Sequence, residues 1–455
     1  MSRFFAALAV ALAVACTVAG PAAGQSTCAY RLFVSNYFTT VRVFDACTGE
    51  YLRDLDPSGR IRGPQAIKAG PDGLVYVTSE MSQQILRYRN DTLEFVDVFA
   101  TIAGIDPTGF AFAPNGEIYV AGFRTDQVRR LSSTGAALGI AIPALAAGLD
   151  GPDNGITFAP DGNLYVPGYN SSNVIRHDPR TGATTAVVAP GAQGLFNTRG
   201  LLPDRKGGGL FITGEGSGQL LRLDLSSGQL TVLSQALLGP TGIDYAPDGT
   251  LLILEGNAVG KFDPATGARV GTLVPGSSGR IDSGTYVAVI AKPAPPKAAA
   301  IEYYNAALDH YFTSALAADI AALDSGALKG WTRTGLSFGA YLEPAAGASP
   351  VCRFYLPPAN GDSHFYSASP AECADVRAKF PTFVYEAADV MHVALPDLVT
   401  GECPPGTQTV YRVWNNRADS NHRYTTDPAV KAAMIAKGYI AEGYGPDAVI
   451  MCAPA

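Results

Sequence analysis

The sequence predicts an all-β fold in which a six-bladed β-propeller precedes a smaller, β-trefoil-like domain with short helices. Three observations predict it. A unit of four short strand patterns, separated by turns rich in Gly and Pro, recurs through residues 25–290. The turn glycines Gly73, Gly116 and Gly162 lie 43 and 46 residues apart, which is the spacing of propeller blades. A different repeat, without these turns, occupies residues 301–455.

The unit from Gly155 to Gly182 preserves the blade pattern best. Residues 160–162 (Pro-Asp-Gly) form a tight turn between its first two strands, and residues 178–182 form the turn before a fourth strand. The first unit lacks a first strand, so residues 285–290 are expected to supply one and to close the ring. The six units are residues 32–49, 66–88, 109–131, 155–182, 200–228 and 242–267.

Composition narrows the possible functions. The chain has 455 residues, with 50 Gly, 32 Pro, a net charge of −7 and no block of basic residues. The many turn residues suit short strands better than long helices. Because nucleic-acid binding requires positive charge against the phosphates, we do not expect a nucleic-acid partner.

The first 24 residues are typical of a secretory signal peptide. Arg3 precedes an apolar segment, Phe4–Ala15, and small residues at 22–24 provide a cleavage site before Gln25. This segment is too short for a stable transmembrane helix, and no later apolar run reaches membrane length. The protein is therefore expected to be secreted or periplasmic, and a lipoprotein anchored at Cys16 is the alternative.

Six cysteines follow the predicted signal peptide, an even number that favours disulfides in an exported chain. A hairpin that pairs Val34 with Val41 would, in the same register, place Cys28 opposite Cys47. Local pairing of the other four is expected, although the spacing does not fix it. Zinc binding is disfavoured because no Cys-x-x-Cys motif occurs. The expected disulfides are Cys28–Cys47, Cys352–Cys373 and Cys403–Cys452.

The blade motifs Pro-Asp/Asn-Gly-x-Ile/Leu-Tyr-Val and Asp-Pro-x-Thr-Gly resemble those of NHL, gluconolactonase-like and streptogramin-lyase-like propellers. The resemblance implies the fold, while the activities of these families differ. Gluconolactonase-like enzymes hold a divalent metal in the channel; here only Asp153 and Asn154 are suitable ligands, and Arg199 would oppose a cation. Streptogramin lyases need a catalytic histidine, and we expect His177, the only propeller histidine, on the rim away from the channel. No cofactor is predicted, with a channel metal as the alternative.

Two sets of repeat-equivalent positions are candidates for ligand binding in the propeller. The first set stands at the start of the blades and consists of Gln65, Thr108, Asp153, Asn154, Arg199 and Thr241. The second set follows the second strand of each blade and consists of Tyr37, Glu80, Phe123, Tyr169 and Glu215, with Glu255 one residue offset. Aromatic and carboxylate side chains on one rim suit a peptide or glycan, and the alternative is a set of ordinary solvated loop ends.

A Pro- and Ala-rich linker is expected at residues 291–300. Beyond it, three units each combine an aromatic strand, a polar turn, a strand that begins near a histidine, and a short helical stretch. Three β-rich units favour a trefoil-like domain with threefold repetition, although helices are unusual in a plain trefoil. The repeat-equivalent histidines are His310, His364 and His422.

The three units resemble a secreted bacterial domain family of unknown function. The resemblance rests on the three histidine segments and on two strands, Cys-Arg-Phe-Tyr with Arg353 and Tyr-Arg-Val-Trp with Arg412. Unit one departs from this pattern, because Glu302 stands in place of the arginine.

Three interpretations of the histidines stay open. Each ring hydrogen-bonds its own polar turn, near Asp309, Asp362 or Asp419. Alternatively, each unit binds a ligand, with an aromatic side chain stacked on a sugar beside a histidine or arginine. A metal bound by all three rings on the threefold axis is the third interpretation. The candidate aromatic side chains are Tyr304, Tyr355 and Trp414.

The sequence as a whole favours an exported, non-catalytic binding protein. The C-terminal domain is expected to bind glycan or other cell-envelope material. No Gly-x-Ser-x-Gly, His-Glu-x-x-His or phosphate-loop motif is present. The alternatives are a propeller enzyme, either a metal-dependent lactonase or a lyase, and a scaffold for a protein partner.

Overall fold

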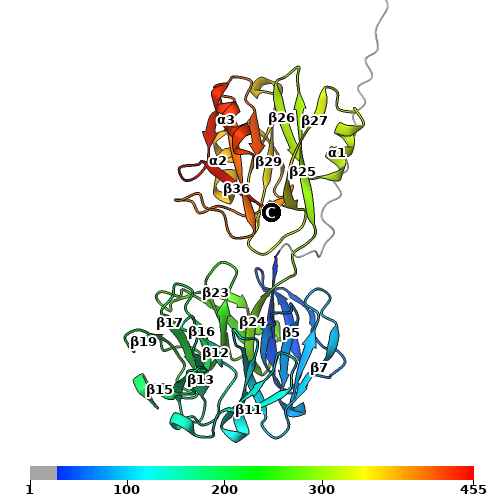
Figure 1. Ribbon diagram of the computed structural model, residues 1–455. Coiled ribbons are helices and arrows are strands. Elements are labelled where there is room, and N and C mark those ends of the chain that lie inside the picture. The colour runs from blue at the N-terminus through cyan, green and yellow to red at the C-terminus, as the bar shows by residue number, and fades with distance from the viewer. Residues whose placement is uncertain (1–27) are drawn as a thin grey trace, which may run out of the picture.

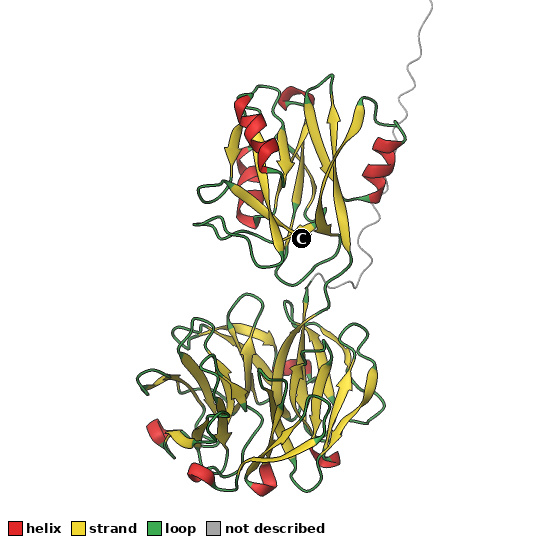
Figure 2. Cartoon of the chain, viewed as in Figure 1, coloured by secondary structure: helices red, strands yellow, loops and turns green. Residues whose placement is uncertain are grey.

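The computed structural model describes residues 28–455, which form two β-rich bodies (Figure 1). Strands dominate both bodies, and the longer helices belong to the second (Figure 2). The predicted signal peptide and the alternative anchor Cys16 lie outside the described residues. None of the helices in residues 28–455 has the length and apolar character needed to cross a bilayer.

The first body contains six four-stranded antiparallel sheets, the arrangement of a β-propeller. Five of them use strands that are consecutive in sequence. The sheets are β24 (Gly284–Ala291), β1 (Tyr30–Asn36), β2 (Val41–Asp45), β3 (Tyr51–Asp54); β4 (Pro64–Ala69), β5 (Val75–Ser79), β6 (Gln84–Tyr88), β7 (Phe95–Thr101); β8 (Pro107–Phe112), β9 (Ile118–Gly122), β10 (Gln127–Leu131), β11 (Ala137–Ile142); β12 (Thr157–Phe158), β13 (Leu164–Gly168), β14 (Asn173–His177), β15 (Thr184–Val188); β16 (Thr198–Pro203), β17 (Gly209–Gly214), β18 (Gln219–Asp224), β19 (Leu230–Ser234); and β20 (Pro240–Tyr245), β21 (Leu251–Glu255), β22 (Ala258–Phe262), β23 (Arg269–Val274).

The two ends of the repeat region share the first sheet. Strand β24 pairs antiparallel with β1, so that Tyr30 lies opposite Ala291 and Ser35 opposite Tyr286. This pairing confirms the predicted closure by residues 285–290. Because the last segment completes the first sheet, neither end leaves an unpaired inner strand at this point.

The predicted register between the first two strands is wrong by one residue. Strand β1 pairs Val34 with Arg42, whereas the sequence analysis expected Val41 opposite it. The turn holds one residue more than a two-residue hairpin loop, and the whole ladder shifts accordingly. The disulfide between Cys28 and Cys47 is nevertheless present, because Cys28 precedes the paired residues of β1 and does not depend on their register.

Each propeller sheet buries both of its faces. In β5, Tyr76 packs with Phe110 of the following sheet, whereas the adjacent Val77 packs with Val43 of the preceding sheet. Successive side chains of a strand point to opposite faces, so a continuous apolar strand serves two neighbours at once. Six apolar clusters lie between successive sheets in this way, and one of them joins the last sheet to the first.

The repeated turn motif has a local hydrogen-bonding cause. In the β4–β5 turn, Asp72 accepts from the Leu74 N–H (3.2 Å) and from the Tyr76 hydroxyl (2.9 Å). In the best-preserved blade, Asp161 accepts from the Tyr165 hydroxyl in the same way (2.8 Å). The turn acid and the strand tyrosine of the motif therefore stabilise each other, which explains why they occur together.

The second body contains three antiparallel sheets, one around the main strands of each predicted unit, and the short strands β28 and β32 of unit two extend the sheet of unit one. Its elements are β25 (Lys297–Asn305), β26 (His310–Ser314), α1 (Ala317–Asp324) and β27 (Trp331–Tyr341) in unit one; β28 (Ser349–Pro350), β29 (Cys352–Leu356), β30 (Ser363–Ser367), α2 (Pro370–Lys379), β31 (Val384–Ala387) and β32 (His392–Val393) in unit two; and β33 (Thr407–Trp414), β34 (His422–Thr425), α3 (Pro428–Ala436), β35 (Ile440–Glu442) and β36 (Val449–Pro454) in unit three. The histidine strands β26, β30 and β34 each form one edge of a sheet.

The second body differs from the predicted trefoil. Its units keep their main strands in separate sheets, with the orders β26-β25-β27, β30-β29-β31 and β34-β33-β35. Along the chain, a helix follows the histidine strand of every unit: α1 follows β26, α2 follows β30 and α3 follows β34. The threefold repetition is present, but the strand pairings within residues 297–454 form three sheets rather than one shared barrel.

The connection between the two bodies is shorter than the predicted linker. Strand β24 ends at Ala291, and β25 begins at Lys297. Lys297 to Ala300 already pair with β27, with Lys297 opposite Tyr341. The strand-free part is therefore 292–296, where three prolines oppose regular strand pairing.

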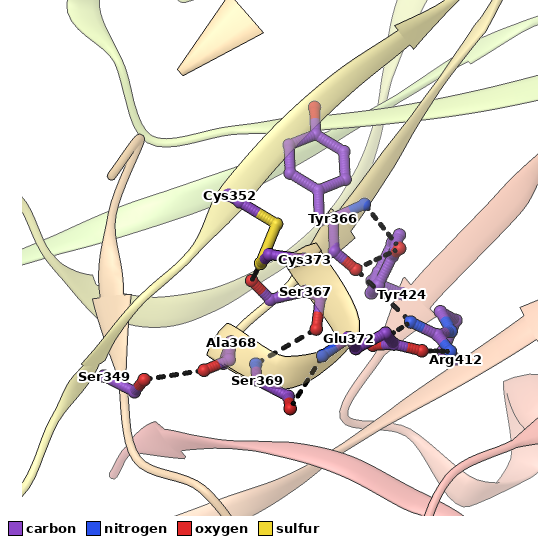
Figure 3. Close-up of a disulfide and its surroundings, with 10 residues drawn as sticks. All are labelled: Ser349, Cys352, Tyr366, Ser367, Ala368, Ser369, Glu372, Cys373, Arg412 and Tyr424. Carbon is purple, nitrogen blue, oxygen red and sulfur yellow. Dashed lines mark hydrogen bonds and ion pairs between the residues drawn. A yellow bond between two sulfur atoms is a disulfide. The ribbon is translucent and has the colours of Figure 1, made fainter. Parts of the chain in front are cut away.

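Three disulfides occur within the described residues. They join Cys28 to Cys47, Cys352 to Cys373 and Cys403 to Cys452. In Figure 3, the second of them ties strand β29 to helix α2. Because disulfides persist in oxidising compartments, three of them indicate an extracellular or periplasmic protein.

Candidate functional site

One end of the propeller channel forms a cavity of about 320 Å³, called here the channel cavity. Positions at the start of inner strands contribute to it, as do positions that directly follow second strands. The two predicted sets of repeat-equivalent residues therefore meet in one place. The lining residues are Tyr37, Gln65, Glu80, Thr108, Phe123, Asp153, Tyr169, Arg199, Ser283 and Thr285.

The channel cavity contains eight of the twelve propeller candidates. Glu255 is buried and paired with Arg269, and the other three lie beside the cavity. Glu215 contacts Arg199 from the neighbouring loop. Asn154 is fully buried, and its amide donates to Gln65 Oε1 (3.1 Å). Thr241 is also buried, and its hydroxyl donates to backbone carbonyl groups.

A buried guanidinium is the positive centre of the channel cavity. Arg199 Nε lies 3.2 Å from Asp153 Oδ2, and Nη1 lies 2.5 Å from Glu215 Oε2. The guanidinium carbon lies 5.6 Å from the centre of the Tyr169 ring. Burial lowers the pKa of Arg199, but the two carboxylates outweigh it and the net pKa is raised. Burial raises the pKa of Asp153, and Arg199 offsets part of this effect.

Glu80 differs from the other carboxylates of this network, because no Lys, Arg or His of residues 28–455 lies within ion-pair distance of it. Its Oε2 accepts a hydrogen bond from the Gln65 amide (2.7 Å). Burial raises the pKa of Glu80 against this hydrogen bond, the charges of Asp153 and Asp106 raise it further, and the charge of Arg199 lowers it in part. Tyr37 lies beside Glu80, and burial and this carboxylate both raise the pKa of its hydroxyl.

The channel residues do not fit a divalent metal ion. Asn154 Oδ1 is buried without a hydrogen-bond partner in the described part of the chain, but its amide nitrogen donates to Gln65. Asp153 and Glu215 are already paired with Arg199, so the carboxylate-rich oxygen cage that a hard divalent cation needs is not available. Within residues 28–455, the one close group of three metal-type ligands is Cys28, Asp45 and Cys47, whose cysteines form a disulfide.

His177 does not line the channel cavity. It lies at the end of β14, and its Nδ1 is 2.9 Å from the Thr184 hydroxyl of the adjacent strand β15. The ring is buried beside Tyr119, and this burial lowers its pKa. The side chain therefore acts as a packed element of the blade.

In the second body, buried arginines connect successive units. Arg412 of unit three donates two hydrogen bonds to Glu372 of helix α2 in unit two (2.7 and 3.0 Å) and one to Glu442 (2.9 Å). It also donates to the Tyr366 carbonyl group, which accepts from Tyr424 as well (Figure 3). A planar guanidinium with several oriented donors suits this task better than a lysine.

The other two unit interfaces use related pairs. Arg353 of unit two contacts Asp319 of helix α1 (2.6 Å) and Glu386 (2.7 Å), in the same pattern as Arg412. At the remaining interface the charges are exchanged, because Glu302 of unit one accepts two hydrogen bonds from Arg423 of unit three (2.8 Å each). The departure of Glu302 from the family pattern is thus compensated within the fold.

The three histidines do not gather around one point. The ring of His310 contacts the Asp419 carbonyl oxygen (3.1 Å), that of His364 contacts Glu386 (3.3 Å), and that of His422 contacts Glu442 (3.4 Å). Each ring therefore has a separate partner, and no cluster of the three is present within residues 28–455.

The expected pairing of each histidine with its own turn is wrong in detail. The Asp309 carboxylate accepts from the Tyr304 hydroxyl (3.0 Å), and the Asp362 carboxylate accepts from the Tyr355 hydroxyl (2.7 Å). In unit three, the Trp414 indole donates to the Ser420 hydroxyl of its own turn (2.9 Å). The first-strand aromatic side chain, rather than the histidine, is the partner of the turn in each unit.

Unit three places its aromatic candidate, Trp414, in a cavity of about 440 Å³ between units two and three. We call it the unit 2–3 pocket. One wall contains Trp414, whose ring is nearly parallel to that of His422 (19°). The lining also contains Phe380 and Phe383, stacked with ring centres 4.9 Å apart. Its polar residues are Asn360, Glu372, Arg412, Ser420, His422 and Glu442.

Comparison with known proteins adds one family match. A family model described as a domain of unknown function (DUF5648) matches residues 300–393, which are units one and two. None of the curated proteins matches the sequence.

The propeller is similar to several solved structures. A structure of a nidogen/laminin complex is 16% identical, with a TM-score of 0.49, and covers 57% of this chain and 98% of that chain. A virginiamycin B lyase from Staphylococcus aureus is 19% identical (TM-score 0.37, 45% and 67% covered), and a streptogramin B lyase is 17% identical (TM-score 0.40, 55% and 76% covered). At this level the similarity concerns the fold alone.

Sequence reasoning missed several residues of these sites. Ser283 and Thr285 line the channel cavity from the start of the closing strand, and the predicted role of residues 285–290 as a first strand was the available signal. Phe380 directly follows helix α2 and Phe383 directly precedes β31, and no sequence motif covers this short connection. No sequence pattern pointed to Glu372 and Glu442, because each is distant in sequence from Arg412, with which it forms an ion pair in the fold.

Proposed function

We propose that the chain is an exported binding protein, a six-bladed propeller joined to a C-terminal domain that binds glycan in the unit 2–3 pocket. The observation that carries this proposal is the pocket itself. It combines two aromatic surfaces, Trp414 and the Phe380–Phe383 stack, with carboxylates and an imidazole. Export is supported by the three disulfides.

A sugar ring matches this combination of groups. Its apolar C–H face packs on an aromatic ring, while its hydroxyl groups need hydrogen-bond acceptors and donors at the edge. Trp414 is held in one orientation by its hydrogen bond to Ser420, so the ring loses little freedom when a ligand stacks on it. Glu372 and Glu442 are only partly buried by their contacts with Arg412 and retain oxygen lone pairs toward the pocket region.

The two alternative functions lack an observation of comparable weight. A metal-dependent lactonase conflicts with the pairing of Asp153 and Arg199, and a lyase of the histidine type conflicts with the position of His177. A protein-binding scaffold remains compatible with the propeller fold, since propellers commonly mediate protein interactions. The glycan proposal is preferred because its residues are already assembled.

A glycan array probed with the full chain tests the proposal. We expect binding to a subset of glycans, and a loss of at least tenfold in affinity for both Trp414→Ala and Phe380→Ala. The matched controls are Tyr304→Ala and Tyr355→Ala, because these residues are the repeat equivalents of Trp414 and do not line the pocket. Absence of binding to every glycan, or equal loss in the control variants, would contradict the proposal.

A folding check separates loss of the ligand site from loss of structure. The chain has two tryptophans, Trp331 and Trp414, and both belong to the second body. In the Trp414→Ala variant the fluorescence of Trp331 alone reports whether this body is folded. An unchanged Trp331 spectrum together with lost glycan binding would assign the effect to the pocket.

A further inference from the structure

The channel cavity has more negative than positive charge. The lining carboxylates of Glu80 and Asp153, together with that of Glu215 beside the cavity, accompany one guanidinium, that of Arg199. At neutral pH this leaves a formal excess of two negative charges at the end of the channel. Asp106 lies nearby but is already paired with Arg124, which follows strand β9. The field in the cavity therefore favours a positive ligand.

Among these three carboxylates, Glu80 is the one without an ion pair, and the charge of Arg199 only partly offsets the effects that raise its pKa. Asp153 and Glu215 both contact Arg199, whereas the carboxylate of Glu80 contacts only the neutral groups of Gln65 and Tyr37. A carboxylate in a partly buried site without a cation is costly, and burial raises its pKa accordingly. A cation bound beside Glu80 would remove this cost.

Aromatic rings surround the same space. Tyr37, Phe123 and Tyr169 follow the second strands of three different sheets, and the rings of Phe123 and Tyr169 have centres 6.1 Å apart. The face of Tyr169 already supports the Arg199 cation at 5.6 Å. Aromatic faces attract cations, best of all those that carry alkyl groups and few water molecules.

Two glycines allow these rings to approach the channel. A Cβ atom on Gly63 would lie 3.3 Å from the Tyr37 ring, and one on Gly151 would lie 3.1 Å from the Phe123 ring. Both glycines have positive φ angles, 64° and 65°, at which other residues are strained. The backbone before the inner strands thus makes room for the aromatic rings.

We propose that the channel cavity binds a small organic ammonium ion, with Glu80 as its counter-ion and the rings of Tyr37, Phe123 and Tyr169 around its alkyl groups. A volume of about 320 Å³ suits a ligand of this size. An anion would meet the uncompensated Glu80, and Arg199 is not available to it because two carboxylates already hold this side chain. This site is independent of the glycan proposal, since it lies in the other body of the protein.

Calorimetric titration of the full chain tests the proposal with four probes. Choline and butylammonium are the cations, and their matched neutral probes are the isostere of choline with carbon in place of nitrogen, and butanol. We expect saturable binding of at least one cation and at least tenfold weaker binding of its neutral match. Equal binding of the neutral match, or no binding of either cation at millimolar concentration, would overturn the proposal.

Variants locate the binding site. Glu80→Gln keeps the shape of the side chain and removes its charge, so cation affinity should fall at least tenfold. Phe123→Leu should weaken binding several-fold by removing one aromatic face. Glu94→Gln, an exposed position in the β6–β7 connection of the same blade, is the control and should bind like the unchanged protein. Retained affinity in Glu80→Gln, with an unchanged circular dichroism spectrum, would refute the assigned counter-ion.

Discussion

Replacement of Arg412 by methionine should strongly destabilise the second body. The guanidinium side chain is only 5% exposed and donates four hydrogen bonds, two to Glu372, one to Glu442 and one to the Tyr366 carbonyl group. Methionine fills a similar volume, so the variant removes charge and hydrogen bonds without creating a large cavity. Two carboxylates then lose their shared cation.

The size of the expected loss in the free energy of unfolding depends on how deeply each partner of Arg412 is buried. Breaking a buried ion pair by removing one member costs about 3–5 kcal/mol. Here the carboxylates retain part of their hydration, since Glu372 is 26% and Glu442 is 30% exposed. The Tyr366 carbonyl group keeps its second donor, Tyr424. We therefore expect the lower end of the range, about 3 kcal/mol in the free energy of unfolding.

Urea unfolding followed by tryptophan fluorescence measures this loss. Both tryptophans lie in the second body, so the signal reports its unfolding without a contribution from the propeller. The control is Lys379→Met, also on the α2 side, whose ion pair with Asp375 has both side chains about two-thirds exposed and should cost about 0.3–0.5 kcal/mol. A loss in Arg412→Met no larger than in this control would refute the reasoning.

A double variant separates the lost cation from lost packing. In Arg412→Met with Glu372→Met, the bidentate pair is replaced by two apolar side chains, and Glu442 keeps His422 as its partner. Replacement of a whole buried pair is often close to neutral, so the double variant should be at least about 1 kcal/mol more stable than Arg412→Met alone. Equal or lower stability would show that packing, and not the unpaired carboxylate, dominates.

Two further predictions use the same fluorescence assay. Replacing Cys352 and Cys373 by alanine should lower the stability of the second body by about 3 kcal/mol, because the disulfide closes a loop with a sequence separation of 21; an unchanged urea midpoint would contradict this. Stability should also fall in acid. Burial raises the pKa of Glu442, but the hydrogen bond from His422 and the charge of Arg412 outweigh it, so the pKa lies below the ordinary value of 4.5. The folded state then binds this proton less readily than the unfolded state, and the stabilisation present above pH 4.5 is lost as the pH falls through the folded pKa. Glu442→Gln should reduce this acid dependence, and an unaltered pH profile would contradict the assignment.

The residues of the channel cavity were largely predictable, because equivalent positions in repeated blades lie in equivalent places around the propeller axis. Positions such as Glu80, Phe123 and Tyr169 occupy the same place in successive blades, and blades are arranged around one axis. Knowing that one of them faces the channel is then enough to place the others. What the repeat does not give is the direction of each side chain, so Asn154 and Thr241 belong to the correct ring but make buried hydrogen bonds instead.

The second body was less predictable, because its polar contacts join different units. The partner of His422 is Glu442 on the third strand, which no turn or short motif connects to the histidine. Arg412 and Glu372 are 40 residues apart and belong to different units. The sequence shows that Glu302 stands in place of an arginine, but only the fold identifies its partner as Arg423.

The two bodies use repetition in different ways, and this difference determines where ligands can bind. In the propeller, equivalent positions converge, so unlike residues from many blades build one cavity. In the second body, equivalent positions are separated into three unit interfaces, each needing its own charge pair. The interface formed by Glu302 and Arg423 is closed, since both side chains are largely buried. The interface at Arg412 keeps partly exposed carboxylates and adds Trp414 and the Phe380–Phe383 stack. A ligand site in this body therefore arises where the residues of one unit differ from the equivalent residues of the other two. Substitutions that make unit three more like unit one should abolish binding without disturbing the other units.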